Sequence, residues 1–245
     1  RRAPMTLQHE TGRTLLPALQ LLLPSRSAEF GTSSNVELEE LLRAALTRLG
    51  GNRSPTLTML TAGTGVRIRL PVGLRRRCKE VGQMLGTATD DEVLEAFGRL
   101  VDEHPDEAHP RIYRGEILLF LGRVDEAAAD FDAAIRLAQL TRWAYIGACA
   151  ASLLSGRPWR GLYFLWLGQR AIKAPPGASS WAWRGECHFR LGHLRTAERH
   201  LHHATRLHPT RLGAWVVLGL VRIARGDRAG VAEVQRDLVL GPRRL

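Results

Sequence analysis

The sequence lacks the signatures of several large protein classes. Its three cysteines, Cys78, Cys149 and Cys187, are odd in number and far apart, which argues against a disulfide framework and for a reducing compartment. It contains no zinc-type Cys/His spacing, nucleophile elbow, Gly-rich phosphate loop or HExxH motif. No apolar run reaches the ~18 residues of a membrane span. We therefore expect a cytoplasmic protein that is not an enzyme and uses neither cofactor nor metal.

The beginning of the chain allows two interpretations. The stretch LLPALQLLLP at residues 15–24 follows Arg1, Arg2 and Arg13 and faintly resembles a signal peptide. Gln20 and two prolines interrupt it, so a short buried helix is the better prediction. Because the first residue is not methionine, we expect a fragment or a processed chain.

Acidic residues are scarce in the second half of the chain. Between Arg142 and Arg225 only Glu186 and Glu198 are acidic. Residues 1–107 hold 14 basic and 14 acidic residues, whereas residues 108–245 hold 21 and 10, which accounts for the whole net charge of +11. This charge predicts an acidic partner, unless the arginines only solvate helix surfaces.

Residues 1–73 have a mixed pattern. Residues 8–23 and 36–49 have the periodicity of amphipathic helices, with a polar linker at 24–35. Residues 54–73 alternate apolar and polar positions around Ala62-Gly63-Thr64-Gly65, which predicts a β-hairpin. We expect a small N-terminal helix plus β-hairpin region, acting as a cap or as the end of a larger domain.

The segment that follows the hairpin has two interpretations. A strand, a basic helix and a second helix capped at Thr89 resemble a ribbon-helix-helix DNA-binding unit. Its nucleic-acid contacts would be Arg67, Arg69, Arg75, Arg76 and Arg77. Alternatively, residues 74–107 are a degenerate copy of a repeat that follows. We favour the repeat, because ribbon-helix-helix strands usually pair between two chains and here a hairpin partner precedes the strand.

One sequence pattern occurs twice in the chain. YRGEILLFLGRVDEAAADFDAAIRL at residues 113–137 returns as WRGECHFRLGHLRTAERHLHHATRL at residues 183–207. The glycine of each turn falls at Gly122, Gly156, Gly192 and Gly226, at intervals of 34, 36 and 34 residues. Small residues recur where two helices would cross, at Gly115, Ala127, Gly185, Ala197 and Gly219. In this period and pattern the chain resembles the tetratricopeptide repeat family, in its bacterial type.

The resemblance implies a mainly α protein, a right-handed α-solenoid of helix-turn-helix repeats over residues 74–245. The expected repeats are 74–107 (degenerate), 108–141, 142–177 (divergent), 178–211 and 212–240. The register of 142–177 is open, and we expect its two extra residues near KAPPGASS, residues 173–180.

The family also implies a concave groove, lined by the first helix of each repeat, that holds a peptide or a partner helix. In this sequence the groove residues would be Tyr113, Glu116, Phe120, Trp143, Trp183, Glu186, Phe189 and Arg190. Aromatic anchors beside arginine are typical of binding hot spots. Tyr113, Trp143 and Trp183 could instead belong to the solenoid core.

The predicted function is that of an adaptor, chaperone or scaffold for an acidic or amphipathic protein segment. Two alternatives remain: a nucleic-acid-associated regulator that uses its basic segments, and an accessory domain of a larger enzyme. His188, His193, His200 and His203 have spacings that could hold a metal ion. Neighbouring arginines disfavour a second cation, so we expect a solvated basic helix there.

Overall fold

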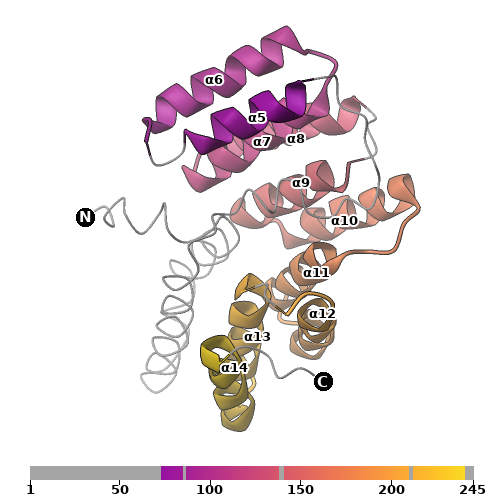
Figure 1. Cartoon of the computed structure of the whole chain (residues 1–245). Coiled ribbons are helices and arrows are strands. Elements are labelled where there is room, and N and C mark those ends of the chain that lie inside the picture. The colour runs from indigo at the N-terminus through magenta and orange to yellow at the C-terminus, as the bar shows by residue number, and fades with distance from the viewer. Residues whose placement is uncertain (1–72, 85–86, 138–140, 210–211, 241–245) are drawn as a thin grey trace. The chain divides into compact units, whose positions relative to one another are not determined.

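The computed structural model describes residues 73–84, 87–137, 141–209 and 212–240 (Figure 1). Within these ranges every regular element is an α-helix, and none is a β-strand. The helices belong to two compact units, α5–α10 and α11–α14. The predicted helices at 8–23 and 36–49 and the hairpin at 54–73 lie outside the described residues, apart from Gly73.

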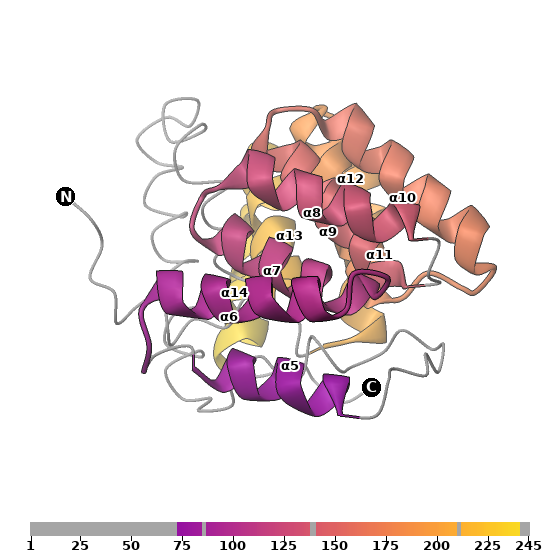
Figure 2. The ribbon, with the colours of Figure 1, turned by 90° about the horizontal axis from the view of Figure 1, so that it is seen from above.

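The helix bounds follow the predicted repeats. The first unit contains α5 (Leu74–Gln83), α6 (Asp90–Glu103), α7 (Ala108–Phe120), α8 (Val124–Arg136), α9 (Arg142–Leu154) and α10 (Pro158–Ile172). The second contains α11 (Ala178–Arg190), α12 (Leu194–Leu207), α13 (Leu212–Ala224) and α14 (Arg228–Leu240). Each predicted repeat interval thus holds one helix pair, and the partners lie side by side in Figures 1 and 2.

The α5–α6 pair packs as an earlier copy of the repeat. Leu74 of α5 and Phe97 of α6 are buried in one apolar cluster with Tyr113 of α7. The predicted cap of α6 is present: the Thr89 hydroxyl accepts from the Glu92 N–H at 3.3 Å, and Glu92 Oε2 accepts from the Thr89 N–H at 2.7 Å. Residues 74–107 thus contain two helices, which both interpretations of this segment predict.

The four turn glycines share one backbone conformation. Gly122, Gly156, Gly192 and Gly226 have φ values of 75°, 70°, 76° and 71°. After Gly192 the His193 N–H donates to the His188 carbonyl at 2.9 Å, and the Gly192 N–H donates to the Phe189 carbonyl at 3.0 Å. This pair of bonds is a Schellman motif, which needs a left-handed residue at its centre. The recurring Leu-Gly or similar dipeptide is therefore the end of the first helix of each pair.

Glycines also set the distance between helices. A Cβ at Gly115 would lie 2.9 Å from Cζ of Phe131, and one at Gly185 would lie 2.5 Å from Cγ of Leu201. In the divergent repeat, a Cβ at Gly168 would lie 2.7 Å from Cγ of Tyr145. In this repeat the glycine is on the second helix and the bulky residue is on the first. The divergent repeat therefore reverses the arrangement found in the other two pairs.

The two extra residues of the divergent repeat lie in a helix. α10 has 15 residues, whereas α8 has 13. The connections before α9 and α11, residues 137–141 and 173–177, are equal in length. The extra residues therefore lengthen the end of α10, directly before residue 173, and leave the connection at 173–177 unchanged in length.

Candidate functional site

The predicted groove residues of the first unit differ in exposure. Tyr113 is only 6% exposed and packs against Phe97, with ring centroids 6.0 Å apart. Glu116 on α7 and Trp143 on α9 are half-buried. Phe120 belongs to the last turn of α7, and its side chain is outside the described part. Tyr113 is therefore a core residue, and Trp143 is the aromatic that keeps partial access to solvent.

The predicted groove residues of the second unit lie on α11. Phe189 is fully buried, and Glu186 is 2% exposed. Arg190 donates from Nε to Glu186 Oε1 at 3.1 Å, so the arginine neutralises a buried carboxylate. Trp183 is half-buried. Trp183 and the outer part of Arg190 are thus the accessible members of this set.

The predicted nucleic-acid contacts lie largely outside the described residues. Arg67 and Arg69 belong to that undescribed part, and the side chain of Arg75 does too. Arg76 is exposed and lies 3.2 Å from Glu80. Arg77 of α5 forms an ion pair with Glu103 of α6. These two arginines therefore contact carboxylates of their own helix pair.

An ion pair joins the two helices of the α7–α8 hairpin. Arg114 Nε and Nη2 donate to the two oxygens of Asp130 at 2.7 and 2.6 Å. Asp130 is 4% exposed. Because both oxygens are engaged in a planar, bidentate pair, Arg114 acts as a clamp between the two helices.

An exposed aromatic stripe on α10 was not predicted. Trp159, Tyr163 and Trp166 are 63%, 53% and 51% exposed, and they account for three of the four large exposed hydrophobic side chains among the described residues. The Tyr163 and Trp166 rings are stacked, with centroids 6.1 Å apart. The guanidinium of Arg170 lies 5.1 Å from the Trp166 centroid. We call these four residues the α10 stripe.

A sequence signal for this stripe exists. Gly161, Leu165 and Gly168 occupy the packing positions of the second helix, and all three are buried. A helix that buries these positions must direct residues 159, 163 and 166 to its opposite face. The aromatic residues at those positions could therefore have been recognised as surface residues.

Histidines and a tryptophan form an aromatic cluster between α11 and α12. Trp181 stacks on His200 with centroids 5.2 Å apart, and His200 stacks on His188 at the same distance. Burial lowers the pKa of His200 from 6.5 to about 4, with the charge of Arg184 adding to the effect. The described residues contain no group of three or more ligands that could hold a metal ion.

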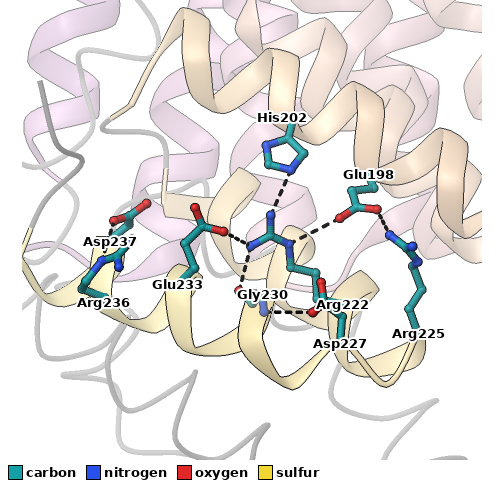
Figure 3. A network of polar contacts seen from close by, with 9 residues as sticks. All are labelled: Glu198, His202, Arg222, Arg225, Asp227, Gly230, Glu233, Arg236 and Asp237. Carbon is teal, nitrogen blue, oxygen red and sulfur yellow. Dashed lines mark hydrogen bonds and ion pairs between the residues drawn. The ribbon is translucent and has the colours of Figure 1, made fainter. Parts of the chain in front are cut away.

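A buried arginine joins the last three helices of the second unit (Figure 3). Arg222 of α13 is 6% exposed. Its Nη1 donates to Glu233 Oε2 at 2.8 Å and to the Gly230 carbonyl at 2.7 Å, both on α14. Its Nε contacts Glu198 of α12 at 3.4 Å, and its Nη2 lies 3.0 Å from Nε2 of His202.

The contact with Arg222 determines the tautomer and the charge of His202. Arginine can only donate, so Nε2 of His202 accepts and the ring proton lies on Nδ1. Burial and the charge of Arg222 both lower the pKa of His202. Glu198 is also paired with Arg225 (Figure 3). Nothing in a single-sequence pattern distinguishes Arg222 from the many solvated arginines nearby, so this network was not predicted.

None of the described helices combines the length and the apolar character of a membrane-spanning segment.

Comparisons with known proteins concern the helical part of the chain. The family model of the tetratricopeptide repeat matches residues 94–140, from α6 through α8. No curated protein matches the sequence as a relative.

Solved structures share the arrangement of helices. TTC0263, a thermophilic TPR protein of Thermus thermophilus, superposes with a TM-score of 0.58 at 19% identity, over 68% of this chain and 90% of that chain. Residues 41-end of MamA from Desulfovibrio magneticus RS-1 give 0.53 at 17% identity, over 71% and 97%. The Cut9-Hcn1 hetero-tetramer of the APC/C gives 0.59 at 18% identity, over 69% of this chain and 32% of that chain. Residues 94–140 therefore match the tetratricopeptide repeat, and the described helices share the fold of these solved structures.

Proposed function

We propose that the chain is a protein-interaction scaffold, an adaptor or chaperone that binds an acidic or amphipathic protein segment through the first helices of its repeats. The observation that carries this proposal is the partial exposure of Trp143 on α9 and Trp183 on α11, one in each unit. A tryptophan that remains accessible on a rigid helix offers a large contact area at little entropic cost.

The charge of the chain supports an acidic partner. Helices α9 and α10, with their connections up to residue 175, contain Arg142, Arg157, Arg160, Arg170 and Lys173 and no carboxylate. Residues 176–240 contain ten arginines and five carboxylates. Complementary charge accelerates encounter and excludes basic partners. Cys78, Cys149 and Cys187 are all buried and suit a reducing compartment, so the proposed location of the scaffold is the cytoplasm.

The experiment compares affinity enrichment with the parent chain and with the single variants Trp143→Ala and Trp183→Ala. We expect each variant to lose a protein partner that the parent captures and to retain the parent's helicity and melting temperature. Arg195→Ala serves as control, because Arg195 is an exposed residue on α12 outside the predicted groove. Retention of every partner by both tryptophan variants would contradict the proposal.

Arg190 is unsuitable for this test despite its place in the predicted set. Its guanidinium neutralises Glu186, which is 2% exposed. Replacing Arg190 would remove an ion pair from a buried carboxylate and destabilise the unit, typically by about 1–3 kcal/mol. Loss of binding in such a variant would not separate recognition from folding.

A further inference from the structure

The α10 stripe differs from the predicted groove in residues and in chemistry. Trp159, Tyr163, Trp166 and Arg170 recur at intervals of four, three and four residues, so they follow one face of the helix over about 16 Å. They share no residue with the groove set. A stripe that exposes three aromatic side chains on one helix is a binding surface by its composition.

Every exposed position of α10 is occupied by an aromatic residue or by arginine. The exposed residues of this helix are Trp159, Arg160, Tyr163, Trp166 and Arg170. No aliphatic side chain and no carboxylate of α10 is among them. A surface with this restricted composition can stack flat rings and attract negative charge, but it offers no acceptor to a basic partner.

Cations extend beyond the two arginines of the helix face. Arg157 precedes α10 and Lys173 follows it, and both are exposed. Asp132 of α8 lies 3.8 Å from Arg160. One long ion pair leaves most of this positive charge available. A polyanion that follows the helix would therefore meet positive charge along its whole length.

We propose that the α10 stripe binds single-stranded RNA, with bases stacked on Trp159, Tyr163 and Trp166 and phosphates beside the flanking cations. Every base has a flat face, so aromatic platforms bind single strands with little regard to sequence. Unpaired bases in RNA are found in loops and at ends, and a surface of about 16 Å suits such a short stretch. The paired bases of a duplex cannot reach the rings.

The experiment measures fluorescence anisotropy of a labelled 12-nucleotide uridine RNA with the full chain at 0.1 M salt. We expect a dissociation constant in the micromolar range, about 10⁻⁶–10⁻⁴ M, and weaker binding as salt increases. Trp159→Ser and Trp166→Ser should each weaken binding about tenfold, because stacking contributes substantially per base. Both variants keep the charge of the parent, so any loss of RNA affinity comes from the missing aromatic ring.

Two comparisons make the result specific. Leu207→Ser removes the other large exposed hydrophobic side chain, 51% exposed on α12, and should leave binding unchanged. The same RNA annealed to its complement should bind more weakly than the single strand. Unlabelled RNA should displace the labelled strand at a lower concentration than poly-glutamate of equal charge.

Three outcomes would overturn the proposal. Parent-like binding by both tryptophan variants would assign the RNA to another site. Equal binding of the duplex would reduce the effect to general electrostatic attraction. Displacement by poly-glutamate as efficient as by RNA would assign the stripe to an acidic protein instead. The groove variants Trp143→Ala and Trp183→Ala should bind RNA like the parent, so failure here leaves the proposed scaffold function standing.

Discussion

The ring of Phe131 lies against Gly147 of the following repeat. A Cβ at Gly147 would be 2.1 Å from Cε1 of Phe131, closer than any real contact between such atoms. A Cβ at Gly115 would lie 2.9 Å from Cζ of the same ring. Phe131 is fully buried. The ring of Phe131 therefore packs against a glycine on each of two helices, Gly115 on α7 and Gly147 on α9. The contact with Gly147 sets how closely adjacent repeats of the first unit pack.

Gly147→Ala should destabilise the chain because the added methyl group has no free space. Phe131 cannot retreat toward α7 without a further clash at Gly115, so we expect a loss of about 2 kcal/mol or more. Urea unfolding followed by far-ultraviolet circular dichroism measures it. Gly98→Ala is the matched control, since its new Cβ would meet only Arg114 Nη1 at 3.8 Å.

The control should be neutral or stabilising, because alanine is a better helix residue than glycine by roughly 0.5–1 kcal/mol. Combining Gly147→Ala with Phe131→Leu should recover part of the lost stability by removing the ring. If Gly147→Ala unfolds at the same urea concentration as Gly98→Ala, the repeats do not pack at this distance.

The contact between repeats shows what a single sequence can and cannot reveal. Phe131 and Gly115 match the family pattern, so their pairing within one repeat was predictable. Counted from the start of its helix, Gly147 occupies the position of Tyr113 in α7 and Trp183 in α11. Because this position differs in every copy, the repeat pattern contains no information about it. Contacts between repeats depend on two copies at once and escape a comparison of copies.

The same reasoning explains the outcome for the candidate site. Turn glycines and helix bounds depend on local backbone geometry, which the sequence encodes directly, and they were predicted well. Exposure depends on the neighbouring helix. Tyr113 and Phe189 are chemically suitable groove residues that are buried, whereas Trp159 and Trp166 on α10 are more than half exposed. Aromatic residues suit a core and a binding surface equally, so only packing distinguishes the two.

Arg222→Met should destabilise the second unit. The change leaves the Gly230 carbonyl and Nε2 of His202 without their donor, and Glu233 loses a cation. A buried acceptor that loses its donor typically costs about 1–3 kcal/mol. Urea unfolding measures the loss, and hydrogen exchange should show faster exchange in α12–α14.

Arg195→Met provides the comparison for this network. Arg195 is exposed on α12, and the same substitution there should change stability by no more than about 0.5 kcal/mol. An Arg222→Met variant as stable as Arg195→Met would mean that the network of Figure 3 contributes specificity of packing rather than stability.

Gly192→Ala should be worse tolerated than Gly192→Asn. Gly192 has a φ of 76° and nothing within 4 Å of a Cβ, so the backbone conformation alone decides the cost. Alanine in the left-handed region costs roughly 1–2 kcal/mol, whereas asparagine adopts this region more readily. Thermal melting of the two variants measures the difference. Equal melting temperatures would indicate that the turn tolerates a right-handed residue.

Acidification should destabilise the second unit through its histidines. Burial lowers the pKa values of His188, His200 and His202, that of His200 from 6.5 to about 4. The unfolded chain therefore binds more protons than the folded one between pH 6.5 and 4. Stability is complete above pH 6.5 and falls as the pH decreases toward 4. At pH 5 we expect His200 alone to contribute a loss of about 2 kcal/mol.

The effect is separable from carboxylate titration by working between pH 7.5 and 5. In His200→Phe the aromatic stack with Trp181 is retained while the titrating group is removed, so its melting temperature should fall less over this interval than that of the parent. His203→Phe is the matched control, because His203 also contacts the Trp181 ring, with centroids 4.7 Å apart, but is exposed. A parent chain whose melting temperature is constant from pH 7.5 to 5 would show that these rings stay solvated enough to accept protons in the folded state.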